Sequence, residues 1–164
     1  MSEKVLLKTF ELIMKHEGGS KITNDPKDPG GLTKYGVSQK AYPNLDIKNL
    51  TLEDASKIFK KDYWDKCKCD DLPDPLSMLV ADCAYNSGVK KSAQILQKAV
   101  GATEDGIIGP KTLQLVKQQD VQKTSWLLRD YRLEYLKTLS TWKTYGNGWN
   151  NRVQMMYDES VKVR

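Results

Sequence analysis

Apolar residues recur at helical spacing along most of the chain. The first such stretch repeats them every three or four positions, at Leu6, Phe10, Ile13 and Met14. Gly18 then stands where a helix C-cap belongs. We therefore predict a helix over about residues 3–17, with Glu17 in its last turn.

Similar patterns predict six further helices, delimited by capping residues, prolines and glycines. Their expected ranges are Thr51 to Asp65, Asp74 to Gly88, 91 to 100 (closed by Gly101), Gly109 to Gln119, 121 to 142, and a last helix from about Trp149. The last helix is expected to start there because glycines at 146 and 148 are predicted to break the chain. The fold class this predicts is mainly α.

The longest stretch without helical periodicity is residues 18–38, directly after the first helix. It contains the runs NDP at 24–26 and PGG at 29–31, which are typical of turns. We expect turns and a short hairpin here. Loops this long inside a compact domain are often functional.

Composition and charge narrow the possible partners. A chain of 164 residues with 39% hydrophobic and 29% charged residues is typical of one globular domain. The net charge of +5 favours a polyanionic partner, such as nucleic acid, an anionic membrane or a bacterial wall. No run of five or more Lys or Arg occurs, so nucleic-acid binding is not expected.

The N-terminus does not resemble a signal peptide, because charged residues interrupt its apolar positions. No apolar run of about 18 residues occurs, so membrane insertion is not expected. The three cysteines, Cys67, Cys69 and Cys83, indicate synthesis in a reducing compartment. Their spacing does not suit a zinc site, and we expect neither a metal nor an organic cofactor.

Glu17 is the first candidate for chemistry. A carboxylate in the last turn of a helix faces the negative end of the helix dipole, which disfavours its charged form. The following loop supplies Asp25, Asp28 and Thr33, which can fold back over the helix end. Glycoside hydrolysis uses such a set: one carboxyl group as acid, and a second group about 6.5–9.5 Å away when a water attacks. Spacing alone leaves open that Glu17 is a solvated surface residue and that the aspartates only form turns.

Several short motifs together carry a resemblance to a known family. They are HEGG at 16–19, NDP at 24–26, DPGG at 28–31, TKYG at 33–36, YW at 63–64, LP at 72–73, DCAYNSG at 82–88, LQKAVG at 96–101, DGIIGP at 105–110 and GWNNR at 148–152. This set resembles glycoside hydrolase family 108, the lysozyme-like N-acetylmuramidases. Cys83 and Tyr85 stand where that family more often has small or aliphatic residues.

The resemblance implies a lysozyme-like α+β helical domain with a short hairpin or loop region after the first helix. It implies a catalytic part over residues 1–90 and a helical, predicted peptidoglycan-binding part over 91–164, packed as one unit. The Glu of the EGG motif is the family's catalytic acid, and that role maps onto Glu17. The pattern at 96–113 is similar to peptidoglycan-binding repeats, although its turn can equally serve only to connect two helices.

Within such a cleft the other polar residues receive hypothetical roles. Asp25 is the first choice for activating water or stabilising positive charge, Asp28 is the second choice or binds substrate, and Thr33 positions a water. Asp82 and Asn86 lie four apart on one helix face, so either both reach the cleft or both are buried polar residues bonded to neighbouring turns. Aromatic residues stack on sugars, and the candidates are Tyr35, Trp64, Tyr85 and Trp149.

The function that the family resemblance implies is that of a muramidase, which cleaves the β-1,4 bond between N-acetylmuramic acid and N-acetylglucosamine in peptidoglycan. A lytic transglycosylase and a non-catalytic wall-binding or secretion-accessory protein are the alternatives. We expect a monomer that is made in the cytoplasm and reaches the periplasmic wall by holin-type release, as a bacteriolytic endolysin does.

Overall fold

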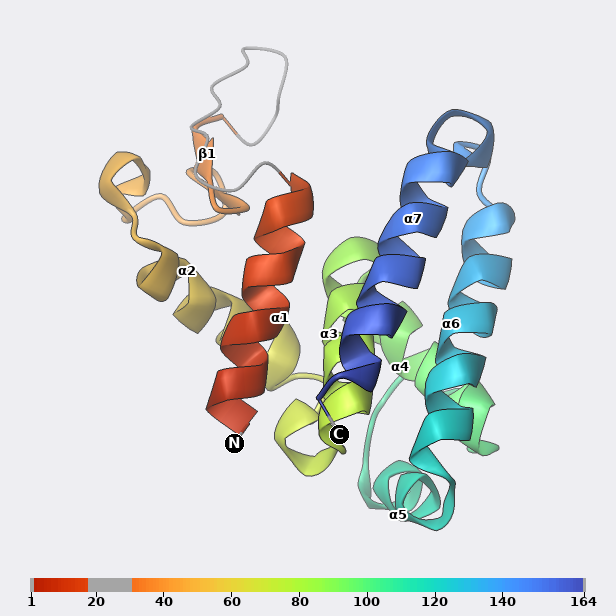
Figure 1. The fold of residues 1–164 in the computed structure, drawn as a ribbon. Helices are drawn as coiled ribbons and strands as arrows, with labels where there is room; N and C mark the ends of the chain where they lie inside the picture. The colour runs from red at the N-terminus through yellow and green to blue at the C-terminus, as the bar shows by residue number, and fades with distance from the viewer. Residues whose placement is uncertain (1, 18–30, 164) are drawn as a thin grey trace.

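The computed structural model describes residues 2–17 and 31–163, and helices dominate this part of the chain (Figure 1). The helices are α1 (Ser2–Glu17), α2 (Leu52–Phe59), α3 (Asp74–Ser87), α4 (Val89–Val100), α5 (Pro110–Gln118), α6 (Val121–Lys137) and α7 (Trp142–Val161). The strands β1 (Thr33–Lys34) and β2 (Val37–Ser38) form a small antiparallel sheet. The mainly α class is therefore confirmed.

Helix α3 lies at the centre of the helical packing. It contacts α1, α4, α6 and α7, and every residue from Pro75 to Ala84 is buried. Figure 1 shows α1 on one side of α3 and the antiparallel pair α6 and α7 on the other. A helix enclosed in this way needs apolar residues on all its faces, and any polar residue in it needs a partner. Asp82 is such a residue, and its partners form the site described below.

A two-residue turn joins the two strands of the hairpin. Tyr35 and Gly36 both have positive φ, 51° and 77°, as a type I′ turn requires. A Cβ atom at Gly36 would also collide with the Tyr85 hydroxyl of α3. Glycine at this position thus allows both the turn and the close approach of α3, which fixes the hairpin next to that helix.

Most of the predicted helix boundaries are confirmed. Thr51 caps α2 by accepting a hydrogen bond from the Asp54 amide at 3.1 Å, and the helix continues as a π-helical segment over Lys60–Trp64. Gly88 and Gly101 end α3 and α4 with positive φ. Pro110 opens α5 as expected.

The predicted break at Gly146 and Gly148 is wrong. Helix α6 ends at Lys137, and α7 begins at Trp142 and runs through both glycines. A Cβ atom at Gly146 would lie 2.7 Å from the Trp142 indole. The glycine therefore makes room for a side chain of the preceding turn.

The three cysteines are free and buried, and they serve as packing residues. Burial raises the pKa of the Cys67 thiol to about 12, with the neighbouring Cys83 adding to the effect. Across residues 2–17 and 31–163, no helix is long and apolar enough to cross a membrane, and no group of His, Cys, Asp and Glu is arranged to hold a metal ion.

Candidate active site

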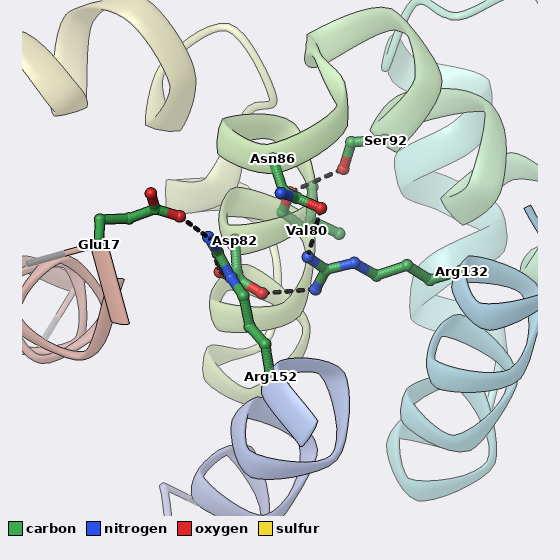
Figure 2. Close-up of polar contacts among 7 residues, drawn as sticks. All are labelled: Glu17, Val80, Asp82, Asn86, Ser92, Arg132 and Arg152. Atoms are coloured by element: carbon green, nitrogen blue, oxygen red, sulfur yellow. Dashed lines mark hydrogen bonds and ion pairs between the residues drawn. The ribbon is translucent and has the colours of Figure 1, made fainter. Parts of the chain in front are cut away.

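Glu17 lies at the C-terminal end of α1, opposite Arg152 of α7 (Figure 2). Nη1 of Arg152 donates a hydrogen bond to Oε1 of Glu17 and forms an ion pair with it. The Glu17 side chain is 43% exposed, whereas that of Arg152 is only 7% exposed. One carboxylate oxygen of Glu17 is thus held from the protein side while the side chain stays accessible to a ligand.

Arg152 is held in turn by Asp82 of α3. Its Nη2 and Nε both donate to Oδ1 of Asp82, at 2.8 and 3.1 Å. The Asp82 side chain has no exposed surface. Two donors on one guanidinium group fix its plane, so Arg152 presents its remaining nitrogen to Glu17 in one orientation.

A second arginine completes the arrangement. Nη1 of Arg132, on α6, donates to Oδ2 of Asp82, and its Nη2 donates to Oδ1 of Asn86 at 3.4 Å. Glu17, Arg152, Asp82, Arg132 and Asn86 therefore form one polar chain that joins α1, α7, α3 and α6, and we call it the charge network (Figure 2). Nε of Arg132 has no hydrogen-bond partner among the described residues.

The charge network keeps Asp82 ionised. Burial alone would raise the pKa of the Asp82 carboxyl, but the charges and hydrogen bonds of Arg132 and Arg152 outweigh it and lower the pKa. A buried aspartate between two buried arginines is costly to desolvate, and it is tolerated because each charge has a partner. Removing one member would leave the others uncompensated, so the network locks the mutual position of the helices that carry it.

Tyr85 forms the apolar side of the site. Its ring lies 6.0 Å from the guanidinium carbon of Arg152 and 5.2 Å from the ring of Tyr63. Burial and the negative charge of Glu17 raise the pKa of Tyr85 to about 12. The Tyr85 hydroxyl is therefore a neutral hydrogen-bond donor near Glu17.

Comparison with known proteins identifies the family. Residues 10–88 match the family model described as Glycosyl hydrolase 108. The structure is also similar to that of Brucella abortus SagA, with a TM-score of 0.83 and 33% sequence identity over 98% of this chain and 96% of that chain. The chain belongs to the glycosyl hydrolase 108 family. None of the curated proteins matches it.

Family membership and the match to SagA confirm the lysozyme-like α+β fold and support a peptidoglycan hydrolase. The family model covers Glu17 and Asp82 but ends before Arg132 and Arg152. The structural match spans nearly the whole chain. The charge network links Asp82, inside the region matched by the family model, to the two arginines beyond it.

The loop residues expected to assist Glu17 are only partly described. Asp25 and Asp28 lie outside the described residues. Thr33 is half-buried in β1, and its hydroxyl donates to the Gly31 carbonyl at 3.3 Å. Tyr35 lies in the hairpin turn, with the Lys34 ammonium group 5.5 Å from its ring centroid.

The residues predicted to bind substrate differ in whether a ligand can reach them. Asp82 has no exposed surface to offer a sugar, which agrees with the buried polar reading that the sequence had left open. Asn86 is exposed, and its Oδ1 accepts a hydrogen bond from Arg132. Trp64 is also buried, and its indole donates to Asp70 at 2.8 Å, so it is a packing residue.

Sequence reasoning assigned no role to Arg132 or Arg152. A signal for Arg132 was present, because it lies midway between Leu128 and Leu136 on the buried face of α6. An arginine on an apolar stripe must be paired when the helix packs. The sequence did not reveal which carboxylate pairs with it.

The turn within residues 96–113 is closed by Gln97. The buried Gln97 amide donates to Asp105 at 2.8 Å and to the Ile107 carbonyl at 2.9 Å, and its oxygen accepts from the Gly106 amide at 2.9 Å. These contacts account for the Leu-Gln and Asp-Gly parts of the motif as a structural connection between α4 and α5. Direct glycan contact by this turn stays a prediction.

Proposed function

We propose that this family 108 protein is an N-acetylmuramidase that cleaves the β-1,4 bond between N-acetylmuramic acid and N-acetylglucosamine, with Glu17 as general acid. The observation that carries the proposal is the Glu17 carboxyl, which stays accessible at a helix end while one oxygen is held by a fixed arginine. Membership of the glycosyl hydrolase 108 family supports the reaction class.

In this mechanism Glu17 gives its proton to the glycosidic oxygen as the bond from that oxygen to the anomeric carbon breaks. Negative charge develops on Glu17 as the proton leaves, and Arg152 lies where it stabilises that charge. Asp82 contributes indirectly, by holding Arg152 in place.

A second group has to bind the attacking water and accept its proton. We propose Asp25 for this role, with Asp28 as the next choice and Thr33 orienting the water. The hydrogen bond from the Thr33 hydroxyl to the Gly31 carbonyl supports the last part, because it leaves the hydroxyl oxygen free to accept from a water.

A lytic transglycosylase is the second candidate. Glu17 is the carboxylate that the charge network presents at its accessible end, and a transglycosylase needs one such group because a hydroxyl of the substrate attacks. The two reactions differ in their products. Hydrolysis yields reducing-end N-acetylmuramic acid, and transglycosylation yields the 1,6-anhydro sugar.

The test is mass spectrometry of products released from purified peptidoglycan by the wild type, by Glu17→Gln and by Glu11→Gln. Glu11 is an exposed residue of the same helix and serves as the control. We expect reducing-end products from the wild type and Glu11→Gln, and a loss of about 10²–10⁴-fold in Glu17→Gln. Anhydro products would establish the transglycosylase. Release of no product from any wall type would refute both enzymes and favour a wall-binding role.

A further inference from the structure

The first turns of α7 carry a group of packed aromatic residues. The rings of Tyr145 and Trp149 are stacked, with centroids 5.7 Å apart and planes 29° apart. The ring centroid of Trp142 lies 6.1 Å from that of Trp149. Tyr145 nevertheless remains 55% exposed.

The support comes from a small separate core. Trp142 and Trp149 pack against Leu133, Leu136 and Val153, which join α6 to α7. Tyr145 itself is outside this core and lies against the Trp149 ring. A ring held in this way offers a flat apolar surface that needs little ordering when a ligand binds.

The position of Tyr145 relative to Glu17 follows from helix geometry. Tyr145 precedes Arg152 by two helical turns, so both residues lie on the same face of α7, about 10 Å apart along its axis. Arg152 on that face binds Glu17. Figure 1 shows the end of α1 and the first turns of α7 at the same end of the molecule.

We propose that Tyr145, supported by Trp149, is a sugar-binding subsite for the glycan strand whose bond is placed at Glu17. The apolar face of a pyranose ring stacks on the exposed face of Tyr145, a few sugar units from the cleaved bond. This inference rests on the proposed function, because it assumes that the strand passes Glu17. It assigns to α7 both the residue that holds Glu17 and the surface that holds the strand.

The other end of the same helix pair supplies a matched control. Trp126 of α6 is 48% exposed and lies edge-on against Tyr157 of α7, with centroids 5.6 Å apart. Its ring is covered by the Arg129 guanidinium group at 4.8 Å. Trp126 is at the start of α6 and Tyr157 near the end of α7, so this pair is remote from Tyr145 in the antiparallel arrangement.

The test measures binding of soluble, peptide-free glycan strands prepared from peptidoglycan. Binding is followed by calorimetry in a Glu17→Gln background, so that the strands stay intact. We expect Tyr145→Ala to weaken binding about tenfold, and Tyr145→Phe and Trp126→Ala to bind like the parent. Equal melting temperatures would show that the exposed substitutions leave the fold intact.

Unchanged binding in Tyr145→Ala, an equal loss in Trp126→Ala, or no binding of strands by the parent would overturn the subsite. The outcome is separable from that of the proposed function. Glu17-dependent product release with no Tyr145 effect would remove only the subsite. Tyr145-dependent strand binding by a protein that releases no product would remove only the muramidase.

Discussion

Two buried polar clusters stabilise this protein, and they differ in how they end. The charge network starts at the accessible carboxylate of Glu17 and runs inward through Arg152 to Asp82. The cluster around Gln97 is largely neutral and closes on the turn that it stabilises. Both satisfy buried polar groups, but the charge network ends on the carboxylate that we propose as the general acid, whereas the Asp105 carboxylate of the Gln97 cluster is bonded within its own turn. The sequence motifs at the two clusters are similarly conspicuous, so the difference becomes visible only from the partners of each residue.

The largest expected effect on stability comes from removing the negative charge at the centre of the charge network. Asp82→Asn leaves Arg132 and Arg152 buried with a neutral partner, and we expect it to lower the free energy of unfolding by about 3–5 kcal/mol. Denaturant unfolding measures this. Asp130→Asn is the control, because that carboxylate pairs with Arg129 at the surface and should cost less than about 1 kcal/mol. A loss in Asp82→Asn no larger than that of the control would contradict the network's structural role.

The same variant tests the pH dependence. The folded pKa of Asp82 is lower than its ordinary value, so its contribution to stability is present above about pH 4, the unfolded value, and is lost as pH falls towards the folded pKa. The wild type should therefore lose stability below about pH 4 more steeply than Asp82→Asn. Parallel acid profiles for the two proteins would argue against a carboxylate at the centre of the network.

The Gln97 cluster should affect stability without affecting catalysis. Gln97→Ala leaves Asp105 and the Gly106 amide without their amide partner, and we expect a loss of about 1–3 kcal/mol in the free energy of unfolding. The control is Gln94→Ala on the same helix, whose exposed amide makes only a 3.4 Å contact with the Glu104 carbonyl. Below its melting temperature, Gln97→Ala should keep the wild-type kcat/KM. A large loss of activity would instead connect this turn to the glycan.

The comparison also shows what local sequence pattern can predict. The first helix, its end at Glu17 and the Thr51 cap were predictable because their signals lie within a few residues. The pairing of Asp82 with two arginines was not, since the partners lie 50 and 70 residues away. The continuous α7 was missed for a similar reason. Glycine is usually a helix breaker, and only the indole packed against Gly146 explains its presence within a helix.

The smallest expected effect tests whether the charge network contributes to kcat through Arg152. Arg152→Lys keeps the positive charge but replaces a planar group that serves both Asp82 and Glu17 with a single ammonium group. We expect kcat to fall about tenfold with KM nearly unchanged. This is less than the roughly 10²–10³-fold loss of kcat that follows complete removal of a hydrogen-bond donor to the developing charge. Arg129→Lys is the control, because Arg129 bonds Gln154 and Asp130 outside the network. A positioning role predicts that the loss in Arg152→Lys appears in kcat and not in KM, since the ammonium group holds the Glu17 carboxylate without the fixed plane of the guanidinium group. A variant that loses stability but keeps the wild-type kcat would reduce Arg152 to a packing residue, and would make the charge network as purely structural as the Gln97 cluster.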